Sequence, residues 1–205
     1  MHPNAILLLG PTGSGKSPLG DLLSAQGLAG ETCYHFDFGE HLRTAAQSPD
    51  TYGLAVREQE YLHDVLASGA LLEGETFYIA EQILAGCMHR LAIRDWLVLN
   101  GLPRHAGQAD AVSQLVHVRL VLQLTCDVET VFLRLASNAG GDRTHRTDDQ
   151  LKLVKHKLAT YQQRTLPLVE WYQTRQVSVL ELPVTDSSMP EDFLPLIEEE
   201  LSLLD

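Results

Sequence analysis

The chain has 205 residues, of which 44% are hydrophobic, and this size and composition suit one globular domain with a substantial core. Its 27 Asp and Glu residues against 15 Lys and Arg give a formal net charge of −12, which disfavours nucleic acid as a partner. No apolar run reaches the roughly 20 residues of a membrane span, and the first ten residues lack the basic flank and cleavage site of a signal peptide.

Strands and helices are predicted to alternate along the chain. The apolar run 4–9 stops at Gly10 and is typical of a strand that is buried on both faces of a parallel sheet. Alternation of this kind favours a parallel sheet whose strands are joined by helical crossovers. The predicted elements in chain order are a strand at 4–9, helices at 16–25, 51–68 and 75–92, strands at 95–100 and 118–124, helices at 127–135 and 151–161, a strand at 177–182 and a closing helix at 190–204.

The most informative motif lies between the first strand and the first helix. It has the form G-x-x-x-x-G-K-S and comprises Gly10, Pro11, Thr12, Gly13, Ser14, Gly15, Lys16 and Ser17. Its glycines let the backbone curl so that successive N–H groups point at one anion, and the following helix adds its positive N-terminal end.

The strand before this loop and the helix after it argue against a glycine-rich turn without function. In a nucleotide-binding loop of this form, Lys16 reaches the β- and γ-phosphates and the Ser17 hydroxyl is a ligand of Mg²⁺. The sequence therefore predicts a P-loop that binds ATP, with Mg²⁺ as cofactor.

A second motif follows the strand at 95–100. Asn100 and Gly101 lead through Leu102 and Pro103 to Arg104, and Gln108 follows four residues later. This segment resembles the adenylate kinase family, a group of nucleoside monophosphate kinases, in which a strand ends in D-G-[FY]-P-R-x-x-x-Q. Three more segments resemble that family in the same order, namely 35–43 (S-T-G-D-x-L-R), 127–135 (the helix entering the lid) and 146–168 (R-x-D-D, R-L-x-x-Y and T-x-P-L).

The resemblance extends over nearly the whole chain and implies both a fold and an activity. The implied fold is α/β, a three-layer P-loop kinase with a central parallel sheet, a helical acceptor-binding insertion and a short lid. The implied activity is transfer of the γ-phosphoryl group of Mg-ATP to a nucleoside monophosphate, by a cytoplasmic monomer. The implied single domain covers 1–205, with its core at 1–30, 70–134 and 160–205, the insertion at 31–69 and the lid at 135–147.

Phosphoryl transfer between nucleotides needs converging cations more than a base, because the attacking phosphate oxygen is already anionic. The resemblance places Arg43 and Arg104 on the acceptor phosphate, where guanidinium forks fit two oxygens. Gln108 would read the base edge, and an amide there resembles the adenine-selective members, so AMP is the expected acceptor. Catalytic roles are implied for Lys16, Arg104, Arg134 and Arg146; Arg134 also binds ATP, and Phe38, Arg143, Arg146 and Lys157 complete the acceptor site.

Three residues depart from the family pattern at the site. Asn100 stands where the family usually has an aspartate that helps to hold the water shell of Mg²⁺, so a carbonyl remains and a charge is lost. Phe38 replaces a threonine near the acceptor base, and Lys157 replaces an arginine, which keeps the charge but loses the fork. These differences bear on substrate and rate more than on the fold.

Other functions remain open at this point. A P-loop kinase with a different small acceptor would account for Phe38 and Asn100, and a non-catalytic nucleotide sensor would bind ATP without transfer. A tRNA isopentenyltransferase shares the loop style LGPTGSGKS, but this chain is short and acidic for that role. Asp148 and Asp149 either belong to the R-x-D-D motif or cap the helix that follows them.

The cysteines and histidines do not predict a metal site. Cys33, Cys87 and Cys126 lie far apart without a C-x-x-C pair, which fits a reducing cytosol. None of the 9 histidines has the spacing of a ligand pair on one helix. Trp96 and Trp171 are predicted to pack in the core or at a hinge.

Overall fold

The fold is that of a computed structural model of the chain, which describes residues 2–89, 91–92, 95–141 and 151–204. The described residues form a five-stranded sheet in the order β2-β3-β1-β4-β5, and every neighbouring pair is parallel. Its strands are β1 (Asn4–Leu9), β2 (Cys33–Asp37), β3 (Trp96–Asn100), β4 (His117–Thr125) and β5 (Ser178–Pro183).

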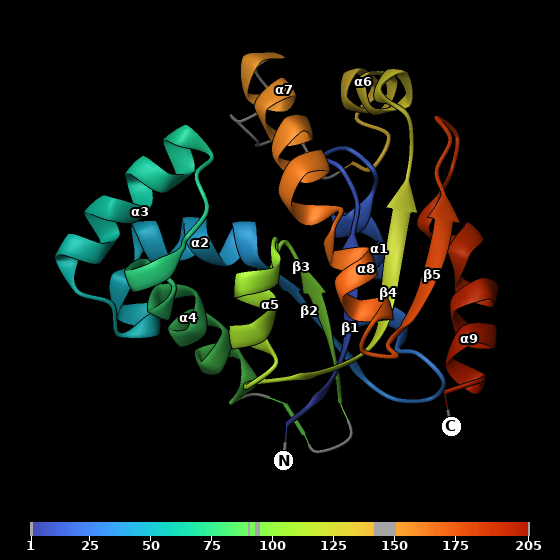
Figure 1. Cartoon of the computed structure of the whole chain (residues 1–205), viewed down its shortest axis with the longest axis horizontal. Helices are drawn as coiled ribbons and strands as arrows, with labels where there is room; N and C mark the ends of the chain where they lie inside the picture. Colours follow the sequence, from blue (N-terminus) through green and yellow to red (C-terminus); the bar gives the residue numbers. More distant parts are fainter. Residues whose placement is uncertain (1, 90, 93–94, 142–150, 205) are drawn as a thin grey trace.

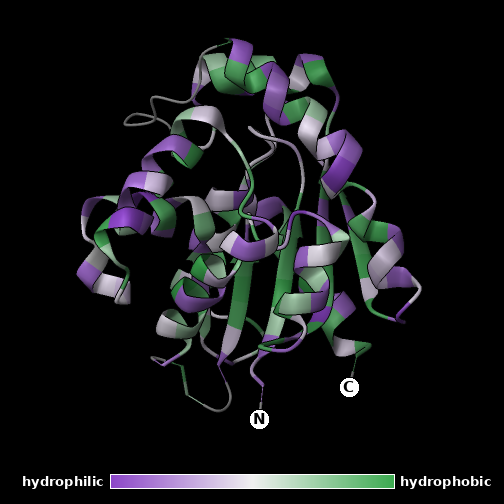
Figure 2. Ribbon diagram, turned by 60° about the vertical axis from the view of Figure 1, so that its left-hand side comes forward, coloured by the Kyte–Doolittle hydropathy of each residue, from purple (hydrophilic) through white to green (hydrophobic). Residues whose placement is uncertain are grey.

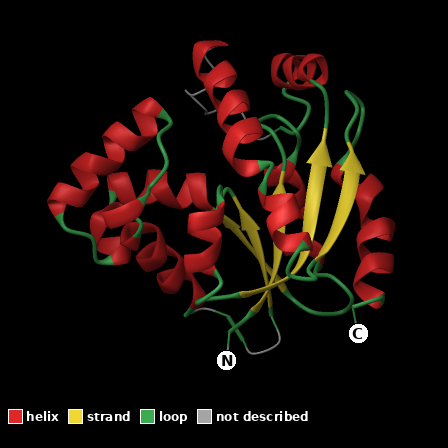
Figure 3. Cartoon of the chain, in the orientation of Figure 1, coloured by secondary structure: helices red, strands yellow, loops and turns green. Residues whose placement is uncertain are grey.

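Helices cover both faces of this sheet, which gives three layers (Figures 1 and 3). One face packs against α1 (Lys16–Gln26) and α9 (Leu194–Ser202). The other packs against α4 (Tyr78–Met88), α5 (Ala106–Val112) and α8 (Leu168–Gln173). The remaining helices are α2 (Phe38–Gln47) and α3 (Val56–Ser68) beside one edge of the sheet, and α6 (Val128–Ser137) and α7 (Leu151–Thr160) beyond the carboxyl ends of the strands.

The central strand β1 is buried on both faces, as its apolar run predicts. Ala5, Leu7 and Leu9 belong to the cluster under α4, α5 and α8, while Ile6 and Leu8 face α1 and α9; none is more than 2% exposed. Figure 2 shows the strands as the most hydrophobic part of the molecule. Burying each large aliphatic side chain contributes about 1.5–3 kcal/mol, so this strand anchors the loop that follows it.

The structure confirms the strands predicted at 4–9, 95–100, 118–124 and 177–182, within a residue or two, and adds β2, which was not predicted. β2 was missed because CYHFD is short and mixes polar with apolar residues. The continuous helix predicted at 51–68 is wrong at its start: a 3-10 turn spans Pro49–Tyr52, and α3 begins only at Val56. The helix predicted at 75–92 ends earlier, because α4 stops at Met88.

The segment assigned to the acceptor-binding insertion, 31–69, contains β2 as well as helices. β2 pairs with β3 inside the sheet, so the helices that project from the sheet edge begin at Phe38. Of the lid assigned to 135–147, residues 142–147 lie outside the described residues. None of the helices in the described part of the chain combines the length and apolar character that crossing a bilayer requires.

Helix α1 approaches β2 closely because it carries glycine at position 20. A Cβ on Gly20 would lie 2.4 Å from two atoms of the His35 ring, which projects from β2. The ring is nearly buried, and its Nδ1 lies 2.8 Å from Oδ1 of Asp21 on α1. Only glycine at position 20 therefore lets the helix and the His35 ring occupy these positions.

We expect Gly20→Ala to lower the free energy of unfolding by about 1–3 kcal/mol, because the added methyl group overpacks the contact with His35. The matched control is Gly86→Ala in the middle of α4, where the new Cβ would meet its nearest neighbour, Tyr52, at an ordinary 3.4 Å. That change should leave stability unchanged or raise it slightly. Urea denaturation measures both, and equal effects would contradict the steric explanation.

Candidate functional site

The predicted P-loop curls between the end of β1 and the start of α1. Gly15 takes a left-handed conformation, with φ 96°, as the residue before the helix. A Cβ on Gly10 would lie 2.8 Å from the backbone oxygen of Leu124 on β4, so the loop needs glycine there for close approach. The backbone thus has the tight curvature that allows consecutive N–H groups to face one anion.

Lys16 is the first residue of α1, and its ammonium group lies over the loop. Its Nζ donates to the carbonyl oxygens of Gly10 and Pro11, both at 2.7 Å. The Ser14 hydroxyl, which is buried, lies 3.5 Å from the same nitrogen. The Lys16 ammonium group therefore lies where the phosphates of a bound nucleotide would lie.

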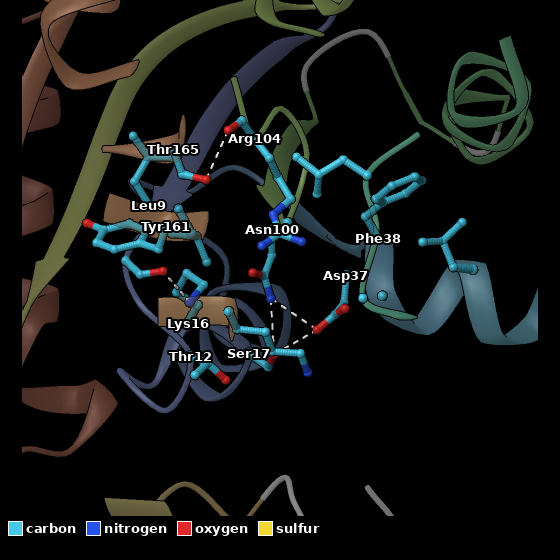
Figure 4. Close-up of a pocket in the computed structure, with 18 of the residues that line it drawn as sticks. Leu9, Thr12, Lys16, Ser17, Asp37, Phe38, Asn100, Arg104, Tyr161 and Thr165 are labelled. Carbon is cyan, nitrogen blue, oxygen red and sulfur yellow. Dashed lines mark hydrogen bonds between the residues drawn. The ribbon is translucent and has the colours of Figure 1, made fainter. Parts of the chain in front are cut away.

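A cavity of about 230 Å³ opens beside this loop, at the carboxyl ends of β1, β2 and β3 (Figure 4). Ligands of open parallel sheets bind at this edge, where the chain order of the strands reverses on either side of β1. The cavity brings together most residues predicted for the site: Gly10, Thr12, Gly13, Gly15, Lys16, Ser17, Phe38, Arg43, Asn100, Arg104, Gln108, Arg134 and Lys157.

Two of the described site residues lie outside the cavity lining. Pro11 and Ser14 belong to the loop but do not line the cavity. Arg143 and Arg146 lie outside the described residues, as do Asp148 and Asp149. Their assigned roles stay predictions.

Three polar side chains meet at the floor of the cavity. Ser17 donates its hydroxyl hydrogen to Oδ2 of Asp37 at 2.7 Å, and Nδ2 of Asn100 donates to the same carboxylate oxygen at 3.0 Å. Asn100 Nδ2 is also 3.1 Å from the Ser17 hydroxyl. Figure 4 shows the three side chains converging from α1, β2 and β3.

The orientation of the Asn100 amide is set by its neighbours. His35 Nδ1 donates to Asp21, which leaves Nε2 as an acceptor 3.4 Å from Asn100 Nδ2. The amide nitrogen thus faces three acceptors, on Ser17, Asp37 and His35. This network holds the side chains of β2 and β3 in register beside the P-loop.

The predicted acceptor segment is held by hydrogen bonds from three directions. Gln108 is buried on α5; its Oε1 accepts from the Arg104 backbone N–H and its Nε2 donates to the Leu72 carbonyl, both at 2.8 Å. Thr165 donates its hydroxyl hydrogen to the Arg104 carbonyl at 2.9 Å. Burial lowers the pKa of the Arg104 guanidinium, and the nearby Arg164 lowers this pKa further.

Other predicted residues lie on different walls. Phe38 and Arg43 come from α2, and the Phe38 ring is buried, with its centroid 6.0 Å from that of Phe36. Arg134 is buried on α6, and its Nε donates to the Gly13 carbonyl at 3.2 Å. Its Nη1 donates to carbonyls that follow β5, among them that of Thr185 at 2.8 Å. Arg134 therefore ties the P-loop to the loop after β5.

Sequence reasoning missed two charged residues near the site. Asp37 lines the cavity and caps α2, where its Oδ1 accepts from the Glu40 N–H at 3.1 Å. Its signal was its place at the end of a strand, but that strand was not recognised. Arg164 forms an ion pair with Glu73 and lies near enough to Arg104 to affect its pKa. No spacing in the sequence marked Arg164.

The cavity is also lined by Tyr161, from the π-helical turn Tyr161–Thr165 that follows α7. Burial raises the pKa of the Tyr161 phenol to about 12, so it is uncharged near neutral pH and is able to donate a hydrogen bond. The described residues contain no group of three or more His, Cys, Asp and Glu side chains placed to hold a metal ion.

A phosphate loop at the carboxyl edge of a parallel sheet, facing a cavity lined by arginines, defines a P-loop phosphotransferase. The chain is 28% identical over 184 residues to an adenylate kinase of Prochlorococcus marinus, which covers 85% of this chain and 86% of the relative. An adenylate kinase of a Cyanothece species is 28% identical over 195 residues, covering 91% and 88%, and one of Nitrobacter hamburgensis is 26% identical, covering 98% and 95%.

No protein-family model matches the chain. The relatives nevertheless span almost its whole length and agree with the fold and the phosphate loop. The chain is thus similar to adenylate kinases over most of its length, and it is a phosphotransferase of the nucleoside monophosphate kinase type.

His105 adds a pH-sensitive group next to Arg104. Its Nε2 is buried without a hydrogen-bond partner, 3.5 Å from a Glu73 oxygen. Burial lowers the pKa of His105, and the cations Arg164 and Arg104 lower it further, while Glu73 acts in the opposite direction. The unfolded chain therefore binds this proton more tightly than the native protein does.

Because of this difference, the free energy of unfolding should fall as the pH drops below the ordinary histidine pKa of 6.5. His105→Asn should remove that part of the pH dependence. His63→Asn, at an exposed position on α3, is the control and should leave it in place. Urea denaturation between about pH 7.5 and 5.5 measures the slopes, and the same slope in wild type and His105→Asn would rule out this role for His105.

Proposed function

We propose that the protein transfers the γ-phosphoryl group of Mg-ATP to AMP. The observation that carries the proposal is one cavity lined by the P-loop cation Lys16 on one side and by Arg43, Arg104 and Gln108 on the other. The relatives are named adenylate kinases, which supports the same assignment.

The donor side follows from the P-loop. The backbone N–H groups of the loop and the N-terminal end of α1 favour the β- and γ-phosphates, and Lys16 neutralises them. Ser17 would hold Mg²⁺ through its hydroxyl oxygen, and the side chains of Asp37 and Asn100 lie beside it. Oxygen is the donor type that Mg²⁺ prefers, and the ion would supply charge neutralisation between the phosphates.

The acceptor side follows from α2, β3 and α5. Arg43 and Arg104 line the same cavity and present planar forks suited to a monophosphate. Gln108 keeps a second lone pair on its oxygen and a second hydrogen on its nitrogen, beyond the two bonds it makes. These can pair with an adjacent donor and acceptor on a base edge, such as N6–H and N1 of adenine, and the relatives named adenylate kinases support AMP among the bases that offer such a pair.

The chemistry of transfer then requires no strong base. An oxygen of the acceptor phosphate attacks the γ-phosphorus. The bond between the γ-phosphorus and the oxygen that bridges the β- and γ-phosphates breaks, so that the donor leaves as ADP and the acceptor becomes a second ADP. Arg134 holds the P-loop through Gly13, and the proposed roles of Arg143, Arg146 and Lys157 are to neutralise the transferring group and the acceptor. We also propose that the protein acts as a monomer in the cytoplasm. Its net charge of −12 supports action on nucleotides rather than on nucleic acids.

The function is tested by a coupled assay for ADP formation with Mg-ATP and AMP, CMP, UMP, GMP or dTMP in turn. AMP should give the highest kcat/KM, because adenine presents an adjacent donor and acceptor to the Gln108 amide and the relatives are named adenylate kinases. Lys16→Ala should bind ATP weakly and transfer nothing measurable, because it removes the phosphate-binding cation. Turnover with another monophosphate alone would replace AMP as the acceptor, and no turnover with any would refute the proposal.

We expect Arg104→Lys to raise the KM for AMP about ten-fold or more, because a charge-assisted hydrogen bond contributes about 1.5–3 kcal/mol and lysine lacks the fork. The KM for ATP should change little. Arg175→Lys is the control, since Arg175 lies over the Trp171 ring, 3.6 Å from its centroid, and does not line the cavity. Initial rates at varied AMP and ATP separate the two constants, and parallel increases in both would argue against a phosphate contact.

A further inference from the structure

The cavity is built for polyanions, yet it contains a carboxylate. In the described part of the chain, five cationic side chains line it, those of Lys16, Arg43, Arg104, Arg134 and Lys157. Among the described residues that line the cavity, Asp37 is the one acidic side chain. A carboxylate beside nucleotide phosphates is unfavourable by simple repulsion, unless a cation lies between them.

The place of Asp37 in the sheet is specific. It is the last residue of β2, and the parallel register pairs it directly with Asn100, the last residue of β3. Asn100 stands where the family usually has an acidic residue. The acid is therefore absent from the end of β3 and present at the matching position of the neighbouring strand.

The contacts of Asp37 direct one of its oxygens to the hydroxyl of the P-loop serine. Oδ2 accepts from Ser17 at 2.7 Å and from Asn100 at 3.0 Å. The other oxygen, Oδ1, accepts from the Glu40 N–H and caps α2. Capping explains Oδ1 alone, because it requires nothing of Oδ2.

The donor set fits Mg²⁺. The Ser17 hydroxyl and the Asp37 carboxylate are hard oxygen donors held in contact with each other, and Mg²⁺ is typically bound by one or two carboxylates together with substrate phosphates and water. His35 and Asp21 orient the Asn100 amide so that its nitrogen faces Asp37. Asn100 is thereby suited to position the carboxylate rather than to replace it.

We propose that Asp37 supplies the carboxylate of the Mg²⁺ shell beside Ser17, with Asn100 as its positioning residue. The negative charge that the family carries at the end of β3 is in this chain carried at the end of β2. This inference rests on the proposed binding of Mg-ATP and identifies the residue that couples the nucleotide to its metal.

The test is the Mg²⁺ dependence of binding of a non-hydrolysable ATP analogue, measured by calorimetry with Mg²⁺ and with EDTA. Asp37→Asn should weaken Mg²⁺ binding to the analogue complex by about 10- to 100-fold, while affinity for the metal-free analogue is unchanged or higher. Asparagine still caps a helix, so α2 is preserved. Asp127→Asn is the matched control, because Asp127 caps α6 through its Oδ1, 2.6 Å from the Thr130 nitrogen, and does not line the cavity.

An exchange of the two residues sharpens the test. The double variant Asp37→Asn and Asn100→Asp moves the charge to the end of β3, next to the same Ser17. It should recover most of the Mg²⁺ affinity that Asp37→Asn loses. Paramagnetic resonance of Mn²⁺, used in place of Mg²⁺, follows metal binding without any turnover.

Two results would overturn the inference. One is an unchanged Mg²⁺ affinity in Asp37→Asn, which would leave Asp37 with the helix cap alone; the other is an equal loss of analogue affinity with and without metal, which would show that Asp37 supports nucleotide binding independently of the metal. Both leave the proposed function in place if the wild type converts AMP. A wild type that neither binds the analogue nor transfers phosphate would instead refute the proposed function itself, and the metal assignment with it.

Discussion

The parallel register of β1, β2 and β3 is the constraint on which the site depends. Asn100 pairs with Leu8 of β1 on one side and with Asp37 of β2 on the other, so three strands end at one level. The P-loop leaves β1 there, and Ser17 at the start of α1 contacts the last residues of β2 and β3. Because the strands are parallel, their carboxyl ends lie at one edge of the sheet, and residues far apart in the sequence meet there.

Positive charge is concentrated at this carboxyl edge of the sheet. An acidic chain would repel nucleotides over most of its surface, but five cationic side chains of the described residues line the cavity. Arg104 is held in place through its backbone by Gln108 and Thr165, and Arg134 through its guanidinium by backbone carbonyls. A guanidinium remains charged even where burial lowers its pKa, and its planar fork is pre-organised, so arginine suits these positions better than lysine.

The differences from the family pattern lie around the site more than in the core. β1 remains a strand of fully apolar residues after Asn4, whereas Phe38 and Lys157 alter the cavity wall. The exchange between Asn100 and Asp37 is of another kind, because the paired positions are adjacent in the sheet and one network holds both. Relatives of about 28% identity match most of the chain, and the proposed exchange concerns only where the charge lies within the site.

The sequence alone determined the P-loop, four of the strands and the class of chemistry. This was possible because the motif is local: an apolar strand, a run of glycines and a helix are read from consecutive residues, and the family resemblance supplied Arg43, Arg104 and Gln108. The contacts of Gln108 with Arg104 and Leu72 were not readable, because they join segments from different parts of the chain.

Only the tertiary structure decided where the acidic group of the site lies. Asp37 ends a strand that is too short and polar to be recognised, and its role in the site depends on its pairing with Asn100, 63 positions away. The same holds for Gly20, whose small size matters only because His35 packs against it. Local patterns record what each segment can form, but strand register and side-chain proximity arise when the segments pack together, and no single segment contains that information.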